Sequence, residues 1–348
     1  FINANIICPL NGILILTELD DNHKNTDITE LQTQQESIEF LTFLILLFYQ
    51  LFATKSMMKD INLQEFCKEL HIYEFGIAPW PLPENAKTIL YETNPCPFTA
   101  ADVEERLLGT TEFTPKSAIV CLFPYYVKHN GPSNLSRYTW GTDYHLVINE
   151  YLEKLIEKLQ KMNTSAQFSI HCDTSPLADR YMAYLAGLGF YGKNNCFISP
   201  KWGSYVVIGT ILTTLEFEPN TPLEQSCMSC NRCITACLGQ CLGHKEFKYD
   251  TCKSYLTQKK GELTDQEQHI IAKTPLVFGC DVCQEVCPHN QSIPATPIPE
   301  FQRVEPYIDI NELETLTNKE FKAKYGNRAF SWRGKKILMR NQNIIEEK

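Results

Sequence analysis

The sequence predicts a layered α/β domain, of α+β type, followed by a small cysteine-rich domain and a short helical C-terminus. Helical and strand patterns alternate across residues 57–220, which is typical of a sheet covered by helices. Most cysteines then crowd into residues 221–295. The proline-rich stretch 288–306 is expected to be a linker or surface wrap, and within the C-terminal part, residues 296–348, a basic helical pattern covers 313–340. We therefore divide the chain into these three parts and treat residues 1–56 as a separate N-terminal extension.

The α/β domain is predicted from hydrophobic spacing. Periodicity is strongest in residues 144–162, where apolar side chains recur at helical spacing and form one buried stripe. The run 205–212 is almost wholly apolar, so we expect a central strand there. The other predicted elements are helices over 61–70 and 177–188, an apolar segment over 74–78, and strands over 118–124 and 168–171.

The N-terminal extension contains one apolar run, residues 40–52. This run is much shorter than the roughly 20 residues that a membrane-spanning helix needs. Acidic residues rather than basic ones precede it, unlike in a signal peptide. We expect the native chain to start at Met57 or Met58, and the protein to be cytoplasmic without a membrane partner. An N-terminal anchor is the alternative interpretation.

The composition permits a sizeable core but gives no uniform basic field. The chain has 348 residues, 43% of them hydrophobic, and a formal net charge of −9. A nucleic-acid partner must therefore meet a local basic patch. Residues 319–340 interleave lysine and arginine with aromatic residues, which suits contact with RNA. A solvated charged helix face is the alternative.

The cysteines point to iron–sulfur chemistry in a reducing compartment. Nine of the 15 cysteines lie between Cys227 and Cys287, a distribution unlike that of secreted disulfide-rich proteins. The first group has the spacing C-x2-C-x2-C-x3-C and the second C-x2-C-x3-C-P, which are typical of chains that wrap [4Fe–4S] cubanes. Two zinc sites are the alternative, but they would leave the third cysteine of each group without a role.

The second group lacks one cysteine, and Cys252 can supply it. In two-cluster ferredoxins the last cysteine of a motif binds the other cluster. This rule assigns one cluster to Cys227, Cys230, Cys233 and Cys287, and the other to Cys237, Cys252, Cys280 and Cys283. Cys241 is a spare thiol that could replace Cys237. Two cubanes form an electron relay, so we expect a small redox donor such as a ferredoxin or flavodoxin.

Several motifs resemble the epoxyqueuosine reductase family. They are S-R-Y-T-W-G-T-D-Y-H (136–145), D-T-S-P-L-A-D-R (173–180), A-G-L-G-F-Y-G-K (186–193), G-S (203–204), C-K-S-Y-L-T (252–257) and G-C-D-V-C-Q (279–284). Their number and order extend the resemblance over about residues 58–340.

The resemblance implies the last step of queuosine synthesis, in which epoxyqueuosine is reduced to queuosine at the wobble position of tRNAs with a GUN anticodon. It also implies a cobalamin, bound base-off without a histidine beneath the cobalt, that receives electrons through the two clusters. We further expect a monomer. The matching motifs imply cofactor contacts from Arg137, Tyr138, His145, Gly189, Lys193, Gly203 and Ser204.

Asp173 is the predicted catalytic residue. Turning an epoxide into an alkene and water takes two electrons and two protons, so a positioned acid is needed. Asp173 follows a predicted strand, at an edge where α/β folds build sites, and it matches the proton donor of the family. For that role burial should raise its pKa above the ordinary value of about 3.9. The alternative is that Asp173 only caps the following helix.

The sequence departs from the family at three places. The usual C-P-T-G-A is replaced by C-L-G-Q-C at residues 237–241, which adds the thiol of Cys241, and Asp179 stands where Glu is common. Many members also carry a C-terminal helical-repeat segment that binds the tRNA, and the sequence ends at Lys348 before such a segment. The alternative functions are another cobalamin and iron–sulfur reductase, similar to reductive dehalogenases, or a simple two-cluster electron carrier.

Overall fold

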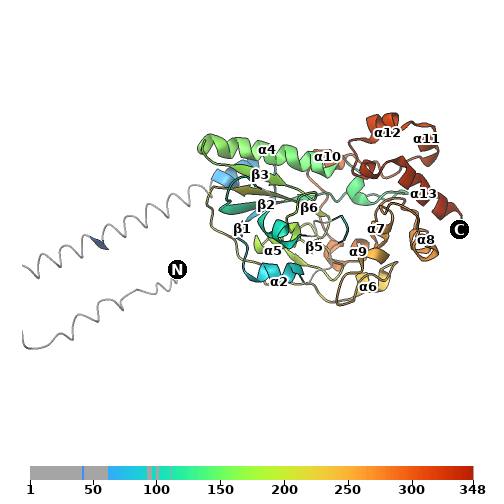
Figure 1. Cartoon of the computed structure of the whole chain (residues 1–348), viewed down its shortest axis with the longest axis horizontal. Helices are drawn as coiled ribbons and strands as arrows, with labels where there is room; N and C mark the ends of the chain where they lie inside the picture. The colour runs from blue at the N-terminus through green and yellow to red at the C-terminus, as the bar shows by residue number, and fades with distance from the viewer. Residues whose placement is uncertain (1–40, 43–61, 92–95, 99–101, 110, 348) are drawn as a thin grey trace, which may run out of the picture. The chain divides into compact units, whose positions relative to one another are not determined.

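The structure is a computed structural model of the whole chain, and it describes residues 41–42, 62–91, 96–98, 102–109 and 111–347 (Figure 1). Residues 58–348 form one compact unit. The expectations for residues 1–56 and for a start at Met57 or Met58 lie outside the described residues, apart from residues 41–42. Among the described helices, none is long and apolar enough to cross a membrane.

A four-stranded antiparallel sheet organises the α/β part, with the strand order β1-β2-β6-β3. Its strands are β1 (Glu74–Pro79), β2 (Ser117–Pro124), β3 (Phe168–His171) and β6 (Val206–Thr213). β2 and β6 pair along their whole length, from Ser117 opposite Thr213 to Pro124 opposite Val206. The prediction of a central strand near residues 205–212 is therefore confirmed.

Both faces of this sheet are covered by helices, so β2 is buried throughout. Alternate side chains of a strand point to opposite faces. Ile119 and its i+2 neighbours belong to one apolar layer with α4 (Tyr144–Met162), while Val120 and its i+2 neighbours belong to a second layer with α5 (Asp179–Leu185). Figure 1 shows α4 and α5 on the two sides of the sheet.

The remaining helices of this part are short. Residues 62–69 are helical, close to the predicted helix. α2 (Asn85–Tyr91) and α3 (Val103–Leu108) pack in the layer of α5 and had no clear sequence signal. α5 is shorter than the predicted 177–188, and the chain reverses after it at Gly187 with φ +70°. A small hairpin of β4 (Phe190–Tyr191) and β5 (Phe197–Ile198) follows.

The cysteine-rich part contains only short helical turns, as its composition predicts. They are α6 (Arg232–Ala236), η3 (Tyr249–Thr251), α7 (Lys253–Leu256), α8 (Asp265–Ile271), α9 (Val282–Glu285) and η4 (Pro288–Asn290). α6 and α9, which carry cysteines of the two groups, contact each other. Packing of these two helices brings together motifs that lie about fifty residues apart in the sequence.

The C-terminal part is helical but broken into short pieces. Its helices are α10 (Pro299–Gln302), α11 (Ile310–Thr315), α12 (Asn318–Tyr325), η5 (Ala329–Arg333) and α13 (Lys335–Glu346). The prediction of a surface linker at residues 288–306 was partly wrong, because Ile298 and Phe301 are buried in the apolar layer of α4. The proline-rich stretch therefore fastens the cysteine-rich part to the α/β part.

Candidate active site and metal centres

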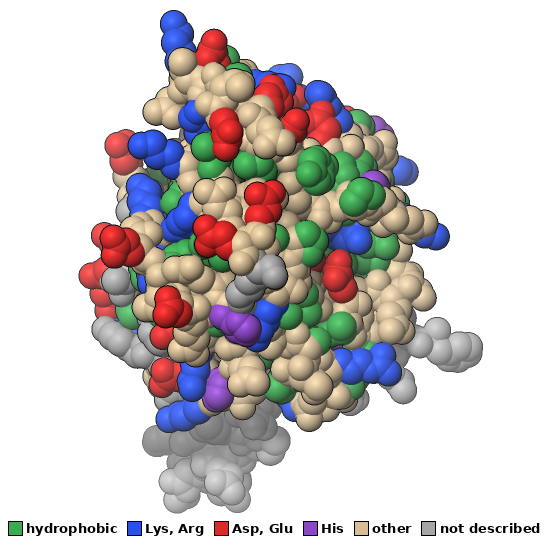
Figure 2. All heavy atoms as spheres, turned by 90° about the vertical axis from the view of Figure 1, so that its right-hand side faces the viewer, with side chains coloured by type: hydrophobic (Ala, Val, Ile, Leu, Met, Phe, Trp, Pro, Cys, Tyr) green, Lys and Arg blue, Asp and Glu red, His purple; other side chains and the backbone are tan. Residues whose placement is uncertain are grey.

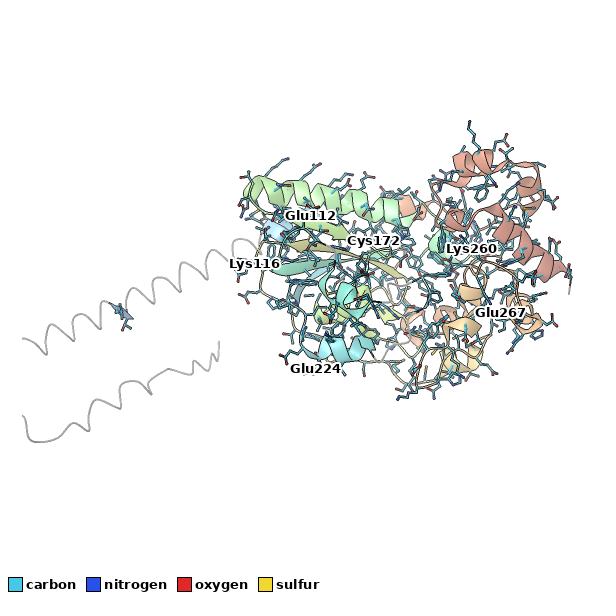
Figure 3. All side chains as sticks on the ribbon, viewed as in Figure 1. Glu112, Lys116, Cys172, Glu224, Lys260 and Glu267 are labelled. Carbon is cyan, nitrogen blue, oxygen red and sulfur yellow. The ribbon has the colours of Figure 1, made fainter. Side chains whose placement is uncertain are left out.

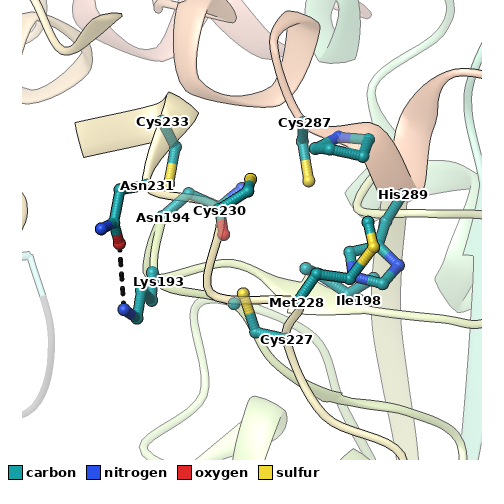
Figure 4. Close-up of a pocket in the computed structure, with 12 residues that line it drawn as sticks. Lys193, Asn194, Ile198, Cys227, Met228, Cys230, Asn231, Cys233, Cys287 and His289 are labelled. Atoms are coloured by element: carbon teal, nitrogen blue, oxygen red, sulfur yellow. Dashed lines mark hydrogen bonds between the residues drawn. The ribbon is translucent and has the colours of Figure 1, made fainter. Parts of the chain in front are cut away.

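Four cysteines surround one small cavity, the first thiol cavity (Figure 4). Two positive φ angles, +55° at Ser229 and +61° at Asn231, wrap the loop before α6 tightly around it. The fourth cysteine comes from the segment after α9. The cavity is lined by Cys227, Cys230, Cys233 and Cys287.

A second cavity, the second thiol cavity, lies between the cysteine-rich part and the α/β part. Its volume is about 230 Å³, and Ser136 and Tyr138 of the α/β part form part of its wall. Its lining thiols are Cys196, Cys237, Cys241, Cys252, Cys280 and Cys283. The two cavities thus divide the eight expected ligands into the same two sets that the crosswise rule assigns, while the ligand roles themselves stay a prediction.

Apart from Cys241, whose sulfur lies 3.2 Å from Cys237 Sγ, the thiols stand around two spaces and do not converge on single points. Among the described residues, no three His, Cys, Asp or Glu side chains are arranged to hold one metal ion. Thiolates that each bind a different iron of a cubane must stand apart in this way. The donor set of each cavity is therefore chemically suited to a cluster.

Asp281 joins the second cysteine group to the α/β part. Its buried carboxylate accepts hydrogen bonds from the Ser136 hydroxyl at 2.5 Å and from the Arg137 backbone N–H at 2.8 Å. Asp281 was not among the predicted site residues, although it lies inside the matching motif at residues 279–284. This contact fixes residues 136–138 against the second thiol cavity.

Gly203 and Ser204 form a second connection between the same two parts. The Ser204 hydroxyl donates to Gln284 Oε1 at 2.9 Å and accepts from the Asn290 side-chain amide at 2.8 Å. Gly203 has φ +61°, and a Cβ there would lie 2.0 Å from Asn290 Oδ1, so the close approach requires glycine. Their predicted contacts with a cofactor stay a prediction, since the contacts present are with the cysteine-rich part.

Arg137 and Tyr138 lie where the two parts meet. The Arg137 guanidinium donates to the Val127 carbonyl and stacks 4.6 Å from the ring centre of Trp140, while its Nε is buried without a partner. Tyr138 lines the second thiol cavity, and burial raises the pKa of its phenol well above the ordinary value. Tyr138 thus lies beside a space that can receive a cofactor, whereas the Arg137 side chain packs against Trp140.

Gly189 and Lys193 lie away from this space. A Cβ at Gly189 would lie 2.2 Å from the Ile198 carbonyl oxygen, so this glycine permits the tight β4–β5 hairpin. Lys193 lines the first thiol cavity, and its ammonium donates to Asn231 Oδ1 at 2.9 Å (Figure 4). The structure therefore does not bring these two predicted residues together with Asp173, and their predicted role as cofactor contacts is not tested by these contacts.

The catalytic candidate Asp173 lies just after β3 and makes a group with two residues at the start of α4. Its Oδ2 accepts a hydrogen bond from the Tyr144 hydroxyl at 2.5 Å and lies 3.4 Å from His145 Nε2. The other ring nitrogen of His145 lies 2.8 Å from Asp143 Oδ1. Asp143 is the N-cap of α4, so the cap that starts the helix also holds His145 in place.

The alternative that Asp173 caps α5 was wrong. α5 begins at Asp179 after Ala178, which makes no side-chain cap, whereas the Asp173 carboxylate turns toward Tyr144 and His145. Asp173 has φ +50°, a conformation that non-glycine residues adopt rarely and that is concentrated at functional sites. Cys172 before it is buried in the interior (Figure 3), whereas Asp173 is exposed.

The expectation of a raised pKa for Asp173 was wrong. Partial burial would raise the pKa, but hydrogen bonds from His145 and Tyr144 outweigh it and hold the pKa below the ordinary value. The proton is held by His145 instead. Burial would lower the pKa of His145, but hydrogen bonds to Asp143 and Asp173 raise it to about 9. At neutral pH the group therefore holds a carboxylate beside an imidazolium.

Asp179 is a second carboxyl group beside Asp173. Burial, and then the charge of Asp173, raise its pKa to about 8, while its Oδ1 is buried without a hydrogen-bond partner. Its carboxyl accepts a hydrogen bond from the Asp173 backbone N–H. The shorter Asp in place of the family's usual Glu thus still supports the backbone that carries Asp173.

The basic tail at residues 319–340 is less available than its composition suggests. Arg328 is buried and forms an ion pair with Glu305, Lys335 donates to the Leu313 carbonyl, and Arg340 donates to the Lys259 carbonyl. On the face shown in Figure 2, positive and negative side chains alternate. Much of the predicted patch therefore stabilises the C-terminal part itself.

One exposed aromatic and cationic group remains on the surface of this tail. Arg333 stacks 3.6 Å from the ring centre of Trp332 and 4.5 Å from that of Phe98. Trp332 is 52% exposed and Phe98 43%. Such rings and guanidinium planes are surfaces on which unpaired RNA bases stack.

Comparison with known proteins agrees with this geometry. Residues 226–290 match the family described as 4Fe-4S double cluster binding domain, and residues 111–174 match the family described as Epoxyqueuosine reductase QueG, DUF1730. The first match covers the residues that line both thiol cavities, apart from those contributed by the α/β part. The second covers Asp173 and its partners Tyr144 and His145.

Relatives and solved structures extend the likeness over most of the chain. An epoxyqueuosine reductase of Lactococcus garvieae is 38% identical over 306 residues, which are 82% of this chain and 85% of the relative. One of Bacillus subtilis is 38% identical over 258 residues, 70% of this chain and 66% of that relative. An epoxyqueuosine reductase structure with an epoxyqueuosine-modified tRNA-Tyr stem loop superposes with a TM-score of 0.74 at 29% identity, covering 83% of this chain and 81% of that one.

An α/β unit joined to a double-cluster module defines this chain as an iron–sulfur oxidoreductase. The chain belongs to the epoxyqueuosine reductase family. The predicted family and fold class are thereby confirmed, and the double-cluster match sets two zinc sites aside.

Proposed function

We propose that the protein reduces epoxyqueuosine to queuosine at the wobble position of tRNA. The observation that carries this proposal is the position of the second thiol cavity, whose wall is formed both by cysteines of the double-cluster module and by Ser136 and Tyr138 of the α/β part. Electrons that arrive at this cavity are therefore next to the part that holds Asp173. Membership of the family supports the substrate.

We propose two [4Fe–4S] clusters as the electron path. Cys227, Cys230, Cys233 and Cys287 would hold the first cluster, and Cys237, Cys252, Cys280 and Cys283 the second. The first cavity lies nearer the surface, since Cys230 is exposed, while the second adjoins the α/β part. A small donor protein would thus reduce the first cluster, and the second would pass electrons inward.

Base-off cobalamin is the proposed electron acceptor, as the family implies. The residues present fit such a polar, amide-rich group, because Asn194 Nδ2, on the wall of the second thiol cavity, and Arg137 Nε, between the cavity-lining Ser136 and Tyr138 in the chain, are buried without hydrogen-bond partners. Arg137, Tyr138 and Asn194 would hold it. His145, the other predicted cofactor contact near the catalytic candidate, lies 3.4 Å from the Asp173 carboxylate. When bound, cobalamin supplies a strongly reducing metal centre for breaking the epoxide C–O bond.

The proton chemistry follows from the charge state of the Asp173 group. Reduction of the epoxide to an alkene and water consumes two electrons and two protons, and negative charge develops on the departing oxygen. Imidazolium His145 holds one proton against the Asp173 carboxylate. We infer that Asp173 delivers this proton to the oxygen while His145 refills it, so Asp173 needs no raised pKa of its own. His145 then takes up the second proton from solvent, and this proton follows the same route to complete the water.

The tRNA is the macromolecular substrate in this proposal, and tRNAs with a GUN anticodon are the expected class. The stacked group of Phe98, Trp332 and Arg333 offers exposed surfaces for unpaired anticodon bases. We also propose a monomer in the cytoplasm, where a ferredoxin or flavodoxin donates electrons. The described cysteines are all free thiols, which suits a reducing compartment.

Nucleoside analysis tests the function directly. The anaerobically reconstituted protein, supplied with cobalamin and a chemical reductant, should convert epoxyqueuosine in tRNA to queuosine, as measured by mass spectrometry of nuclease digests. Iron content should be about eight atoms per chain, because two cubanes hold four each. About four irons, or no uptake of cobalamin with no conversion, would contradict the proposal and favour the electron-carrier alternative. Conversion of an organohalide but not of the tRNA would favour the dehalogenase-like alternative.

A further inference from the structure

The spare thiol Cys241 lies beside one of the proposed ligands of the second cluster. Its sulfur is 3.2 Å from Cys237 Sγ, and Cys252 lines the same cavity. Cys241 itself is only 2% exposed. This buried thiol therefore lies next to the sulfur of Cys237, which is a proposed ligand of the second cluster.

The three sulfurs differ in their backbone surroundings. Cys237 Sγ accepts a hydrogen bond from the Cys241 N–H at 3.4 Å, and further ones from the backbones of Gly239 and Leu242. Cys252 accepts hydrogen bonds from the backbones of Ser254 and Tyr255. Backbone donors of this kind stabilise a thiolate that binds iron. Cys241 instead shares a hydrogen bond with the sulfur of Cys237 itself.

The short contact between Cys237 and Cys241 also indicates which of these two cysteines binds an iron of the cluster. Two thiolates that bind different irons of one cubane are separated by the cube, so they cannot touch as Cys237 and Cys241 do at 3.2 Å. Only one of the pair can be a ligand in this arrangement. Cys237 has the backbone donors, which leaves Cys241 with its proton.

We propose that the Cys241 thiol donates an S–H hydrogen bond to the ligand sulfur of Cys237 and thereby raises the reduction potential of the second cluster. A hydrogen bond to a ligand sulfur offsets part of its negative charge, and this favours the reduced cluster, which carries one more electron. The inference rests on the proposed function only in requiring the second cluster. Because family members commonly carry Ala at this position, the second cluster of this chain should be easier to reduce than one that lacks the thiol.

The test compares Cys241→Ala with Cys241→Ser, which keeps a donor, and with Cys96→Ala, which removes a thiol outside both cavities. Each purified, anaerobically reconstituted protein is analysed for iron and then titrated redox-potentiometrically with EPR detection. All should hold about eight irons per chain. Cys241→Ala should shift one of two midpoint potentials to a more negative value, Cys241→Ser should restore most of the shift, and Cys96→Ala should leave both potentials unchanged.

Three results would overturn the inference. Unchanged potentials in Cys241→Ala would show that the thiol does not act on the cluster. A fall to about four irons in Cys241→Ala would make Cys241 a ligand. Full iron content in a fourth variant, Cys237→Ala, would show that Cys241 binds the iron that we assign to Cys237. If the unaltered chain holds only about four irons, the proposed function fails as well, and iron content separates that case from the others.

Discussion

Replacing Asp173 by Asn tests the proposed proton delivery. The amide has nearly the shape of the carboxylate and can still accept from the Tyr144 hydroxyl, but it cannot pass on the proton of His145. A positioned general acid contributes about 10²- to 10⁴-fold in rate. Turnover of epoxyqueuosine-containing tRNA should fall by a factor in that range, which equals about 3–5 kcal/mol of activation free energy.

The pH dependence of turnover provides a second test of proton delivery by Asp173 and His145. The folded-state pKa of His145 is raised from 6.5 to about 9, so His145 stays protonated up to that pH. Turnover by the unaltered protein should therefore fall as the pH rises through about 9. The ion pairs of His145 should also stabilise the fold fully below pH 6.5, and this contribution should be lost as the pH rises from 6.5 through about 9. The residual turnover of Asp173→Asn should lack this alkaline fall.

The assay measures single-turnover formation of queuosine by mass spectrometry, under anaerobic conditions, at several pH values. Iron and corrinoid contents are measured on the same samples, since the 59% exposed Asp173 side chain should be replaceable without loss of either. Glu153→Gln, a change on the exposed face of α4, serves as the matched control. A rate within tenfold of the unaltered protein, with the alkaline fall preserved, would place the proton donor elsewhere.

Three further predictions concern the structure around the site. Gly203→Ala should lower the melting temperature, measured by calorimetry, more than Gly261→Ala does. Both glycines have positive φ, but only at Gly203 would the new Cβ clash with Asn290. Equal decreases in melting temperature would exclude that clash. Asn341→Ala should lower the free energy of unfolding by about 2–4 kcal/mol, measured with denaturant against Asn343→Ala, because the side chain donates to two buried carbonyls. Cys287→Ala should leave about four irons per chain, and full iron content would refute its place in the first cluster.

The chemistry of the cysteine-rich part could be predicted from the sequence because the spacing of cluster ligands is local. Three thiols within seven residues, from Cys227 to Cys233, can reach one cavity whatever the rest of the chain does. The crosswise partition also followed from a general rule of two-cluster motifs. The internal position of β6 and the long helix α4 were equally visible, because burial on one or both sides leaves a periodic apolar pattern.

The protonation of the Asp173 group could not be read from the sequence. Asp143 and His145 are neighbours in the chain, but Asp173 reaches them only because β3 ends beside the start of α4. That approach replaced the expected raised pKa by a lowered one and moved the proton to His145. The dominant partner of an ionisable group is often distant in sequence, and only packing brings it close.

The sequence by itself determined the family, the cluster motifs and the order of the main helices and strands, since these depend on residue types at short spacing. Only the tertiary structure decided that Gly203 and Ser204 hold the cysteine-rich part, that basic residues of the tail stabilise the chain itself, and that Cys241 touches Cys237 and lies beside Cys252. Contacts of this kind depend on distances of a few ångströms between distant segments, and no local pattern of residues encodes them.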